Sequence, residues 1–557
     1  MKKYIFIALF VVWATVSLFV RTVGLESSPA SMGFDEASLG YNAYSILLTG
    51  KDEYGTRFPL SLRSFNDFKP ALYAYLAIPF IKYFGLSQTS TRLPSAVFGT
   101  LSLIFLYLIF KKLSGRSNLM SLLVIAFVSF LPWELHFSRV ALEANVSMSF
   151  FTGAVWCLIN FKRNKFYKIG LIFFSTLSIY SYHSARVAIP VLVFLALVDP
   201  ISLDLKKFVK MPINTIKKLW PLLIILILYI PLFLEFQASL ILTRLGQTNI
   251  FSHFYPFTPR ELIFMPNAWL NIIGHPLYFL GGYITGHLFS YLSPQNLSLL
   301  IYPGVINSDQ VISGTGMLGT VGGFLFTIGL VLQLKEIVLD KNKRIISYWI
   351  ISGIIPAAIT WEWFYPLRSL NIYPAINIIV GFGIVSVLTF LVKRKKIFKY
   401  FLVSAFVLIM VTTSLYNLLN ELNFGAWETG GEFQPGGFKQ AVPLILSLQN
   451  EYKMIYLDSN QGQSYEIFWF YMHYSPSEIQ KLSSIRNDPG VEGPSTINFG
   501  KFIYKKFDWP HDKYKDSFIY FTNSEVKEDE IASTQGSKLY KIFDQTGNWV
   551  ASVITKQ

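Results

Sequence analysis

The chain begins MKKYIFIALFVVWATVSLFV (residues 1–20), in which two lysines precede an apolar stretch that carries no charge before Arg21. About twenty apolar residues are enough to cross the hydrocarbon core of a bilayer. No small-residue cleavage site is clear after this stretch, so it predicts a retained first transmembrane helix near 4–24. A cleaved signal peptide is the alternative, and the length of the apolar stretch argues against it.

Ten further apolar runs are long enough to be membrane spans. They lie near 92–110, 118–133, 145–161, 167–182, 184–198, 219–236, 316–334, 345–362, 370–392 and 398–417. Of the 557 residues, 52% are hydrophobic and only 15% are charged, which a soluble protein could not accommodate on its surface. We therefore expect an α-helical polytopic membrane protein of about eleven spans. The run 268–292 contains glycine and proline and is expected to be interfacial or re-entrant.

The charge between the apolar runs predicts the orientation of the chain. With the N-terminus in the cytoplasm, the inside segments hold 23 lysines and arginines, whereas the longer outside loops hold 10. This bias follows the positive-inside rule. The outside loops are then 25–91, 134–144, 183–186, 237–315 and 363–369, and the polar C-terminal segment is outside as well. The net charge of +15 lies mostly in short membrane loops, which argues against a nucleic-acid partner.

The composition changes after the last apolar run. Residues 420–557 hold 13 basic and 17 acidic residues, so we divide the chain into a membrane domain, 1–419, and an extracytoplasmic domain, 420–557. The predicted strands of the second domain are MIYLDS, EIFWFYMHY, SFIYFTN and KLYKIF, and its predicted helices are 437–450 and 525–535. These elements favour a small α/β fold, joined to the membrane domain by a glycine-rich hinge, 425–437.

The first outer loop contains the first candidates for chemistry. In MGFDEASLGYNAYSILLTGKDEYG (32–55), Asp35 and Glu36 precede apolar residues at helical spacing. The spacing predicts a helix in the membrane interface with both carboxylates in its first turn, where the helix dipole favours negative charge. The pair is therefore either an ordinary acidic first turn or a reactive site. Glu143, at the start of the fourth apolar run, is a second acidic candidate on the same side.

Basic side chains near span ends on this side are the complementary candidates. They are Lys69, Arg139, His183, Arg186 and Arg368. Ionisable groups at membrane depth are costly and are functional candidates, whereas snorkelling to lipid head groups is the alternative explanation. Arg139 can also form a local pair with Glu143, and His183 is more simply a packed polar group.

Carboxylates and cations at the rim of a bilayer suit a reaction on a lipid phosphate. A carboxylate can take the proton of an attacking hydroxyl, and Arg or Lys can hold the phosphate that leaves. The sequence has no P-loop or other glycine-rich nucleotide motif, which favours a lipid-linked donor. Scattered histidines and a single cysteine, Cys157, indicate no metal site, although an acidic pair can hold a divalent cation through oxygen ligands.

Three segments of this region resemble a known family. FDEASLGYNAYSILLTGKDEYG (34–55), SFNDFKPALYAYLAIP (64–79) and TRLPSAVFG (91–99) are similar to bacterial members of the protein O-mannosyltransferase and lipid A aminoarabinose transferase family. The resemblance covers 25–200 well and 345–390 loosely. It implies a GT-C fold and an inverting glycosyltransferase, with a polyprenyl-phosphate sugar as donor and a hydroxyl of a glycan, lipid or protein as acceptor.

The resemblance also implies roles for individual residues. Asp35 would be the base that activates the acceptor hydroxyl, and Glu36 and Glu143 would place the acceptor or tune Asp35. Lys69, Arg186 and Arg368 would bind the carrier phosphate, with Arg139 and His183 as possible support. Arg92, in the Arg-Leu-Pro step, would be structural.

Two departures from the family limit these implications. Ala37-Ser38-Leu39 stands where the aminoarabinose transferases have a proline, and 237–315 holds no counterpart of the large eukaryotic mannosyltransferase loop domain. Neither acceptor can therefore be carried over. A transporter or flippase of lipid-linked sugars is the main alternative, and it predicts mid-span charges and inverted repeats. A membrane scaffold is a further alternative, in which Asp35 would be replaceable.

Overall fold

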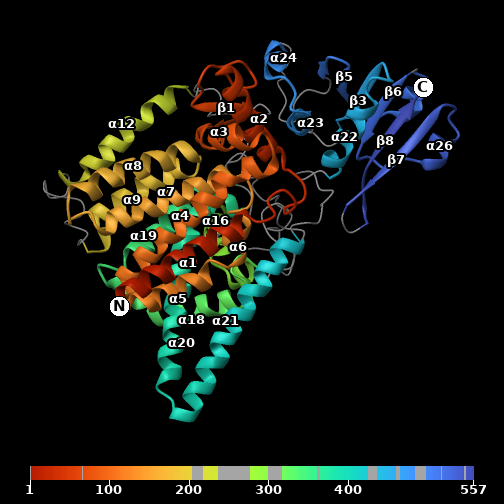
Figure 1. The fold of residues 1–557 in the computed structure, drawn as a ribbon. Helices are drawn as coiled ribbons and strands as arrows, with labels where there is room; N and C mark the ends of the chain where they lie inside the picture. The colour runs from red at the N-terminus through yellow and green to blue at the C-terminus, as the bar shows by residue number, and fades with distance from the viewer. Residues whose placement is uncertain are drawn as a thin grey trace, which may run out of the picture.

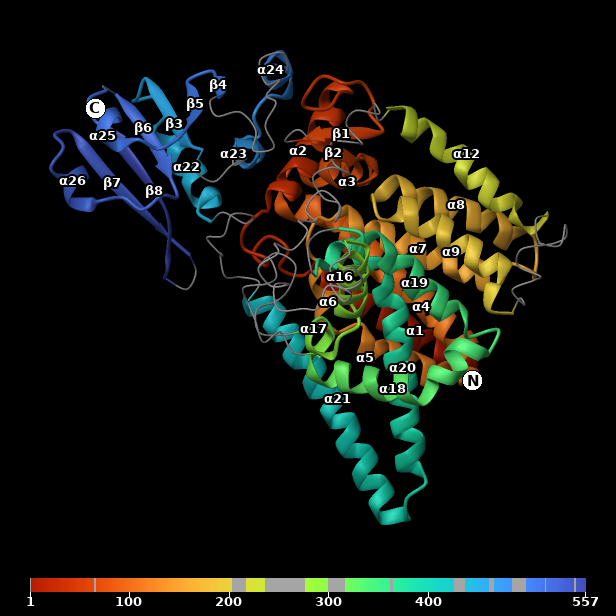
Figure 2. The same ribbon diagram turned by 180° about the vertical axis from the view of Figure 1, so that it is seen from behind.

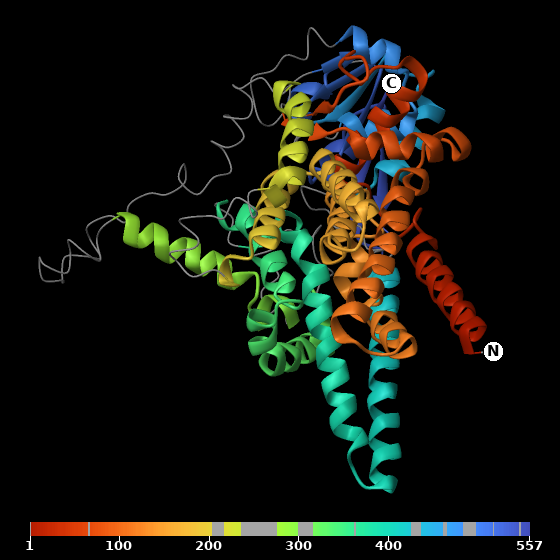
Figure 3. The same cartoon turned by 90° about the vertical axis from the view of Figure 1, so that its left-hand side faces the viewer.

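The structure is a computed structural model, and it describes residues 2–64, 67–202, 217–235, 276–298, 316–360, 364–424, 436–459, 465–482, 497–515, 517–544 and 547–557. A bundle of apolar helices carries the short elements of the first outer loop at one end, and the C-terminal sheet lies beside those elements (Figure 1). A long helical hairpin near residues 373–424 extends from the other end of the bundle, as Figure 3 shows.

Eleven helices coincide with the eleven apolar runs predicted as spans. They are α1 (Lys2–Thr22), α4 (Gln88–Ser114), α5 (Asn118–Val128), α7 (Glu143–Ile159), α8 (Lys165–Ser181), α9 (Ala185–Val198), α12 (Trp220–Glu235), α18 (Gly319–Leu339), α19 (Ile345–Ala358), α20 (Tyr373–Val392) and α21 (Lys396–Phe424). Among the described residues, 6 helical stretches are long and apolar enough to cross a membrane: Lys3–Thr22, Gln88–Ser114, Lys217–Leu234, Gly319–Leu339, Pro366–Val392 and Phe398–Asn423. The helical membrane fold is therefore confirmed, whereas the count of eleven spans stays a prediction.

Apolar side chains are exposed along several of these helices. Examples are Val12 and Phe19 on α1, Leu223 on α12, and Phe401 and Leu408 on α21. Apolar surface of this extent is expected to face lipid or another apolar surface. The chain is a multi-pass membrane protein, and the cytoplasmic position of its N-terminus stays a prediction.

Shorter helices connect the bundle. They are α6 (Pro132–His136), η1 (Pro200–Ser202), η2 (Lys217–Leu219), α16 (Pro276–Ser290), α17 (Pro294–Ser298) and η5 (Pro366–Ile372). The predicted interfacial run 268–292 is described only from 276 onward, where it forms α16, and 268–275 lie outside the described residues. Of the predicted outer loop 237–315, the structure describes only 276–298.

The segment 25–91, predicted as the first outer loop and called so below, forms a compact group of elements: α2 (Phe34–Thr49), β1 (Ser61–Ser64), β2 (Asp67–Pro70) and α3 (Leu72–Phe84). The helix predicted after the acidic pair is confirmed, because α2 has Asp35 and Glu36 in its first turn. It ends at Gly50, whose φ of 69° is the left-handed conformation that terminates helices. Strands β1 and β2 form an antiparallel hairpin in which Leu62 is paired with Lys69.

The C-terminal segment forms one sheet with the strand order β4-β5-β3-β6-β8-β7. Its strands are β3 (Met454–Asp458), β4 (Ile497–Phe499), β5 (Phe502–Lys505), β6 (Phe518–Thr522), β7 (Ser537–Phe543) and β8 (Trp549–Lys556). Its helices are α22 (Phe438–Leu448), α23 (Tyr465–Met472), α24 (Pro476–Lys481), α25 (Trp509–Asp512) and α26 (Glu528–Ala532). Strand β3 is parallel to β5 and β6, and the outer pairs are antiparallel.

The predicted elements of this segment are partly confirmed. Strands β3, β6 and β7 and helix α22 match the predictions, and α26 is shorter than the predicted 525–535. The prediction of a strand at EIFWFYMHY is wrong, because these residues form α23. Parallel strands such as β3 and β5 need a crossover between them, and α23 belongs to that connection. Most of the predicted hinge, residues 425–435, lies outside the described residues.

One hydrophobic core joins the first outer loop to the C-terminal segment. Phe34 and Tyr73 of the loop share a cluster of buried residues with Phe468, Trp469 and Phe499. Figure 2 shows α23 and α24 between the sheet and α2. The division at residues 419 and 420 stays our proposal, and the shared core means that the C-terminal segment packs against the elements that carry the acidic motif.

Candidate active site

Asp35 and Glu36 are adjacent in the first turn of α2, but they face opposite surroundings. The side chain of Asp35 is 59% exposed, whereas that of Glu36 is 2% exposed. Consecutive residues of a helix are about 100° apart around its axis, so one can face inward while the next faces outward. The two carboxylates belong to two separate clusters.

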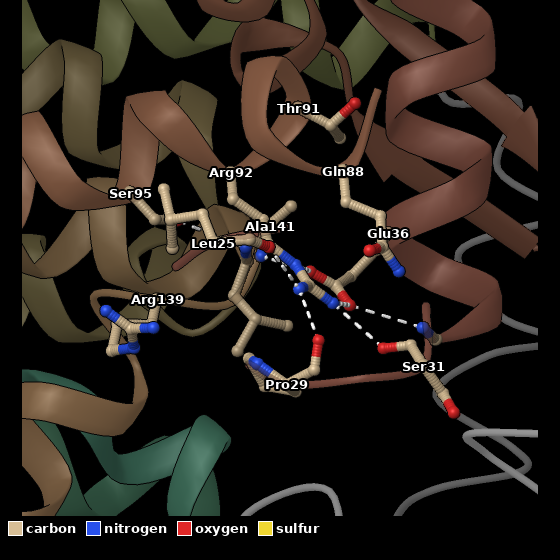
Figure 4. Close-up of polar contacts among 12 residues, drawn as sticks. Leu25, Pro29, Ser31, Glu36, Gln88, Thr91, Arg92, Ser95, Arg139 and Ala141 are labelled. Atoms are coloured by element: carbon tan, nitrogen blue, oxygen red, sulfur yellow. Dashed lines mark hydrogen bonds and ion pairs between the residues drawn. The ribbon is translucent and has the colours of Figure 1, made fainter. Parts of the chain in front are cut away.

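Glu36 lies in a buried and closely bonded cluster, shown in Figure 4. Arg92 Nε and Nη2 donate to its two carboxylate oxygens, each at 2.8 Å, in the bidentate geometry that suits guanidinium and carboxylate. The backbone N–H groups of Gly33 and Ala141 donate to the same carboxylate at 3.2 and 2.7 Å. Arg92 also donates to the carbonyls of Leu25, Pro29 and Ser31. We call these contacts the Glu36 cluster, and they fit the structural role expected for Arg92.

The Glu36 cluster brings a second acidic segment to α2. The bond from the Ala141 N–H to Glu36 holds the residues that precede α7 against the start of α2. Leu142 N donates to the hydroxyl of Ser95 on α4, and Asn145 Nδ2 donates to the carbonyl of the same residue. Glu143, the first residue of α7, is therefore buried close to the start of α2. The two acidic positions predicted from distant parts of the sequence come together in the fold.

Arg139 has a structural position beside this segment. Its guanidinium donates to the carbonyls of Val20, Val23 and Ser28 and forms an ion pair with Glu421 at 3.8 Å. These partners tie the end of α1 to the end of α21. The alternative of a local pair with Glu143 is not among these contacts, and the supporting role of Arg139 in catalysis stays a prediction.

Asp35 forms an ion pair with Lys69, which lies buried on β2. Burial alone would lower the pKa of Lys69, but the charges of Asp35, Glu143 and Glu466 outweigh it and raise the pKa. The lysine is therefore held in its charged form by carboxylates from α2, α7 and α23. We call these four residues the Lys69 cluster.

Glu466 was not among the residues selected from the sequence. It lies in the aromatic stretch EIFWFYMHY, for which the sequence predicts a strand of the domain 420–557. A carboxylate within such a stretch indicates that a cation lies nearby, because a buried charge is costly without a nearby opposite charge. The sequence does not reveal that its partner cation lies in the first outer loop.

The remaining basic candidates lie on segments that adjoin β2. His183 Nε2 donates to the carbonyl of Phe68 at 2.9 Å, next to Lys69, and Ser184 accepts a bond from Asn371 at 3.2 Å. The first bond holds the turn before α9 against β2, and α9 carries Arg186. The second ties that turn to η5, which carries Arg368.

The two arginines on these segments are both half-buried. Arg368 also lies over the ring of Tyr365, 4.4 Å from its centre. The predicted donor-binding residues thus come from neighbouring segments, and their roles stay predictions.

No group of three or more His, Cys, Asp or Glu side chains in the part of the chain that the structure describes is arranged to hold a metal ion. The possible use of a divalent cation stays a prediction.

Comparisons with known proteins define the fold. No protein-family model matches the chain, and no curated protein matches its sequence. Among solved structures, ArnT from Cupriavidus metallidurans bound to undecaprenyl phosphate is similar over 98% of this chain and 97% of its own, with a TM-score of 0.52 and 13% identity. The apo state of the same protein has a TM-score of 0.52 and 12% identity over the same shares.

A weaker likeness connects the chain to an archaeal protein. AglB, the oligosaccharyltransferase of Archaeoglobus fulgidus, has a TM-score of 0.48 and 12% identity over 85% of this chain and 64% of its own.

ArnT is a lipid A aminoarabinose transferase and a GT-C fold glycosyltransferase. Because the likeness to ArnT extends over nearly the whole of both chains, the expected fold is confirmed, and this chain has the GT-C fold.

Proposed function

We propose that this protein is an inverting glycosyltransferase that moves a sugar from a polyprenyl phosphate to a hydroxyl acceptor. The observation that carries the proposal is the pair of Asp35 and Lys69, in which an exposed carboxylate at a helix start contacts a buried, charged lysine. The fold shared with ArnT, which was solved with undecaprenyl phosphate, supports a donor of this kind. The acceptor is a hydroxyl of a glycan, a lipid or a protein.

The chemistry requires one base and one site for an anion. The acceptor oxygen attacks the anomeric carbon while the bond from that carbon to the phosphate oxygen breaks. Asp35 takes the acceptor proton, and the polyprenyl phosphate leaves with the electron pair. Attack on the face opposite the leaving phosphate inverts the anomeric centre. Cations near the leaving oxygens stabilise the charge that develops there.

Lys69 is suited to a role in both halves of this reaction. Its ammonium group is paired with Asp35, and a positive charge at this distance makes Asp35 a weaker base. A phosphate that approaches Lys69 competes for the same ammonium and weakens its hold on Asp35. Donor binding thus increases the basicity of Asp35 at the moment when an acceptor can use it. Arg186 and Arg368, on segments that adjoin β2, are the further phosphate ligands.

Glu36 and Glu143 have positioning roles in this proposal. Glu36 fixes the start of α2 through Arg92 and links it to Ala141, so it orients Asp35 without facing the substrate. Glu143 adds negative charge beside Lys69. The positive-inside bias supports a site on the outer face, with the C-terminal segment on that side.

The test is sugar transfer by the purified full chain in liposomes, with a panel of polyprenyl-phosphate sugars as donors and membrane extract as the source of acceptors. Wild type should transfer sugar from at least one donor, and Asp35→Asn should lose transfer while it inserts and folds normally. Lys69→Gln should mainly raise the apparent KM for the donor, and Lys69→Arg should retain part of the activity. Asp529→Asn, which neutralises an exposed carboxylate on α26, is the matched control.

Two results would contradict the proposal. Full activity of Asp35→Asn would exclude Asp35 as the base. Failure of well-folded wild type to transfer sugar from any donor would exclude the reaction and favour the transporter alternative. The orientation is tested separately by a reporter fused at the C-terminus, which should lie outside the cell.

A further inference from the structure

Glu466 has an unusual environment for a carboxylate of the C-terminal segment. It lies in the first turn of α23 and is fully buried, between the aromatic residues that join this segment to α2. Burial of a charged carboxylate is costly unless a cation offsets it. The proposed function assigns Glu466 no role.

Helix α23 is held closely against α2. The rings of Tyr41 and Trp469 are 5.8 Å apart, and the Tyr41 hydroxyl donates to the carbonyl of Tyr474 at 2.9 Å. A Cβ at Gly40 would lie 2.6 Å from Thr91 Oγ1 of α4 and 2.7 Å from the Phe470 ring, so a larger residue would force one of these side chains to shift. Nearby, the amide of Gln480 donates to Ser45, Thr49 and Asp52.

The geometry of α23 directs Glu466 toward the same side. Residues 466, 469 and 470 have the i, i+3, i+4 spacing of one helix face, and Trp469 and Phe470 contact α2. Glu466 lies at the N-terminal end of this face. This face of α23 is turned toward α2, and the charge of Glu466 acts on Lys69.

The charges around Lys69 agree with this geometry. Burial lowers the pKa of Lys69, but the charges of Asp35 on α2, Glu143 on α7 and Glu466 on α23 outweigh it and raise the pKa. His183, from the turn before α9, is bonded to the neighbouring carbonyl of Phe68. Glu466 is the member of the Lys69 cluster that the C-terminal segment supplies.

We propose that Glu466 is a positioning residue for Lys69, so that the donor-phosphate site is complete only when α23 is docked on α2. Glu466 holds the ammonium group charged and correctly placed while Asp35 changes partner during the reaction. The C-terminal segment thus takes part in the site through one carboxylate. This inference rests on the proposed function for its role in donor binding, but the effect of Glu466 on Lys69 can be measured without any transfer reaction.

The first experiment measures the titration of Lys69 directly. The full chain is labelled briefly with a small amine-directed reagent between about pH 7 and pH 11, and the extent of labelling at Lys69 is read by mass spectrometry. Glu466→Gln should lower the midpoint for Lys69 by about one pH unit, because a carboxylate that favours the charged amine is lost. Two controls should leave it unchanged: Glu525→Gln, at an exposed position, and Tyr41→Phe, which alters the same helix contact without altering charge.

The second experiment measures donor use. Glu466→Gln should raise the apparent KM for the polyprenyl-phosphate sugar about tenfold and shift the alkaline limb of kcat/KM to lower pH. Glu466→Asp, which keeps the charge, should recover part of both effects. If Glu466→Gln does not fold, the Lys69 midpoint of Glu466→Asp is the deciding measurement, and it should lie between the wild-type value and that of an unperturbed lysine.

The two proposals fail in distinguishable ways. An unchanged Lys69 midpoint in the folded Glu466 variants would overturn the inference, whatever the transfer assay finds. A lowered midpoint in a protein that transfers no sugar would support the effect of Glu466 on Lys69 and would reject the proposed function.

Discussion

The Glu36 cluster and the Lys69 cluster meet in the first turn of α2, and each contains an ion pair between a carboxylate and a buried cation. In the Glu36 cluster both partners are inaccessible, and the carboxylate accepts bonds from Arg92, Gly33 and Ala141. In the Lys69 cluster the cation is buried but its partner Asp35 is largely exposed.

The difference separates a structural ion pair from one that can change partner. An exchange of partners in the Glu36 cluster would leave several buried groups without hydrogen bonds, which is costly. In the Lys69 cluster an incoming anion can replace Asp35 without opening the fold. Substitutions in the first cluster should therefore affect folding, and substitutions in the second should affect function.

The largest expected effect is on the Glu36 cluster. Arg92→Leu should destabilise the protein by about 3–5 kcal/mol, because it leaves Glu36 buried without its cation. The measurement is thermal unfolding of the detergent-purified chain, together with the yield of folded protein. Arg116→Leu, at an exposed position, is the matched control and should behave like wild type. A thermal midpoint for Arg92→Leu equal to that of the control would remove the distinction between the clusters.

The adjacent carboxylates provide the sharpest test of the comparison. Asp35→Asn should leave stability within about 0.5 kcal/mol of wild type and reduce transfer about 10²–10⁴-fold, because the base is lost. Glu36→Gln should cost about 1–3 kcal/mol in stability, because a charged partner of Arg92 is lost. Thermal unfolding and transfer are measured on both variants. The reverse pattern, with Asp35→Asn unstable and Glu36→Gln stable but inactive, would exchange the roles of the two residues.

Asp52 tests what burial does to a carboxylate when burial is the largest influence on it. Burial, with the neighbouring Glu53 adding to it, raises the pKa of Asp52 to about 6, although bonds from the N–H groups of Thr56 and Tyr54 oppose the shift. In the unfolded chain the carboxyl ionises near its ordinary pKa of about 4. Between these values the folded state binds more protons, so this group makes stability fall as pH rises from about 4 to about 6.

Asp52→Asn should therefore stabilise the protein at pH 7.5 by up to about 3 kcal/mol and have little effect near pH 4. The amide oxygen of asparagine can still accept the bonds from Tyr54 and Thr56. The measurement is thermal unfolding of both proteins at the two pH values. An equal gain at both would show that ionisation of Asp52 is not responsible.

The smallest expected effect concerns the contact that holds α23 on α2. Tyr41→Phe removes the bond from the hydroxyl to the Tyr474 carbonyl and keeps the ring against Trp469. It should cost about 1 kcal/mol, measured as a small decrease in the thermal midpoint. Tyr514→Phe, at a side chain that is 78% exposed, is the control and should cause no decrease. A large loss of transfer in Tyr41→Phe without loss of stability would mean that this hydroxyl serves the site itself.

Much of the fold could be predicted because the signal is local. Long apolar runs coincide with helices, and the spacing after Asp35 and Glu36 correctly predicted α2. The C-terminal segment was harder, because short aromatic stretches suit either a strand or a buried helix. EIFWFYMHY became α23, and strands β4, β5 and β8 were missed. Their pairing is set by partners distant in sequence.

The membrane fold and most of the residue types available for the site follow from local patterns in the sequence. The surroundings of these residues depend on tertiary contacts: Arg92, 56 residues away, closes around Glu36, whereas Lys69, 34 residues away, leaves Asp35 accessible. These contacts also let the charge of Glu466, in the C-terminal segment, act on Lys69. The physical reason is that hydrophobic spacing depends on neighbours a few residues apart, whereas burial and charge depend on which distant segments pack together.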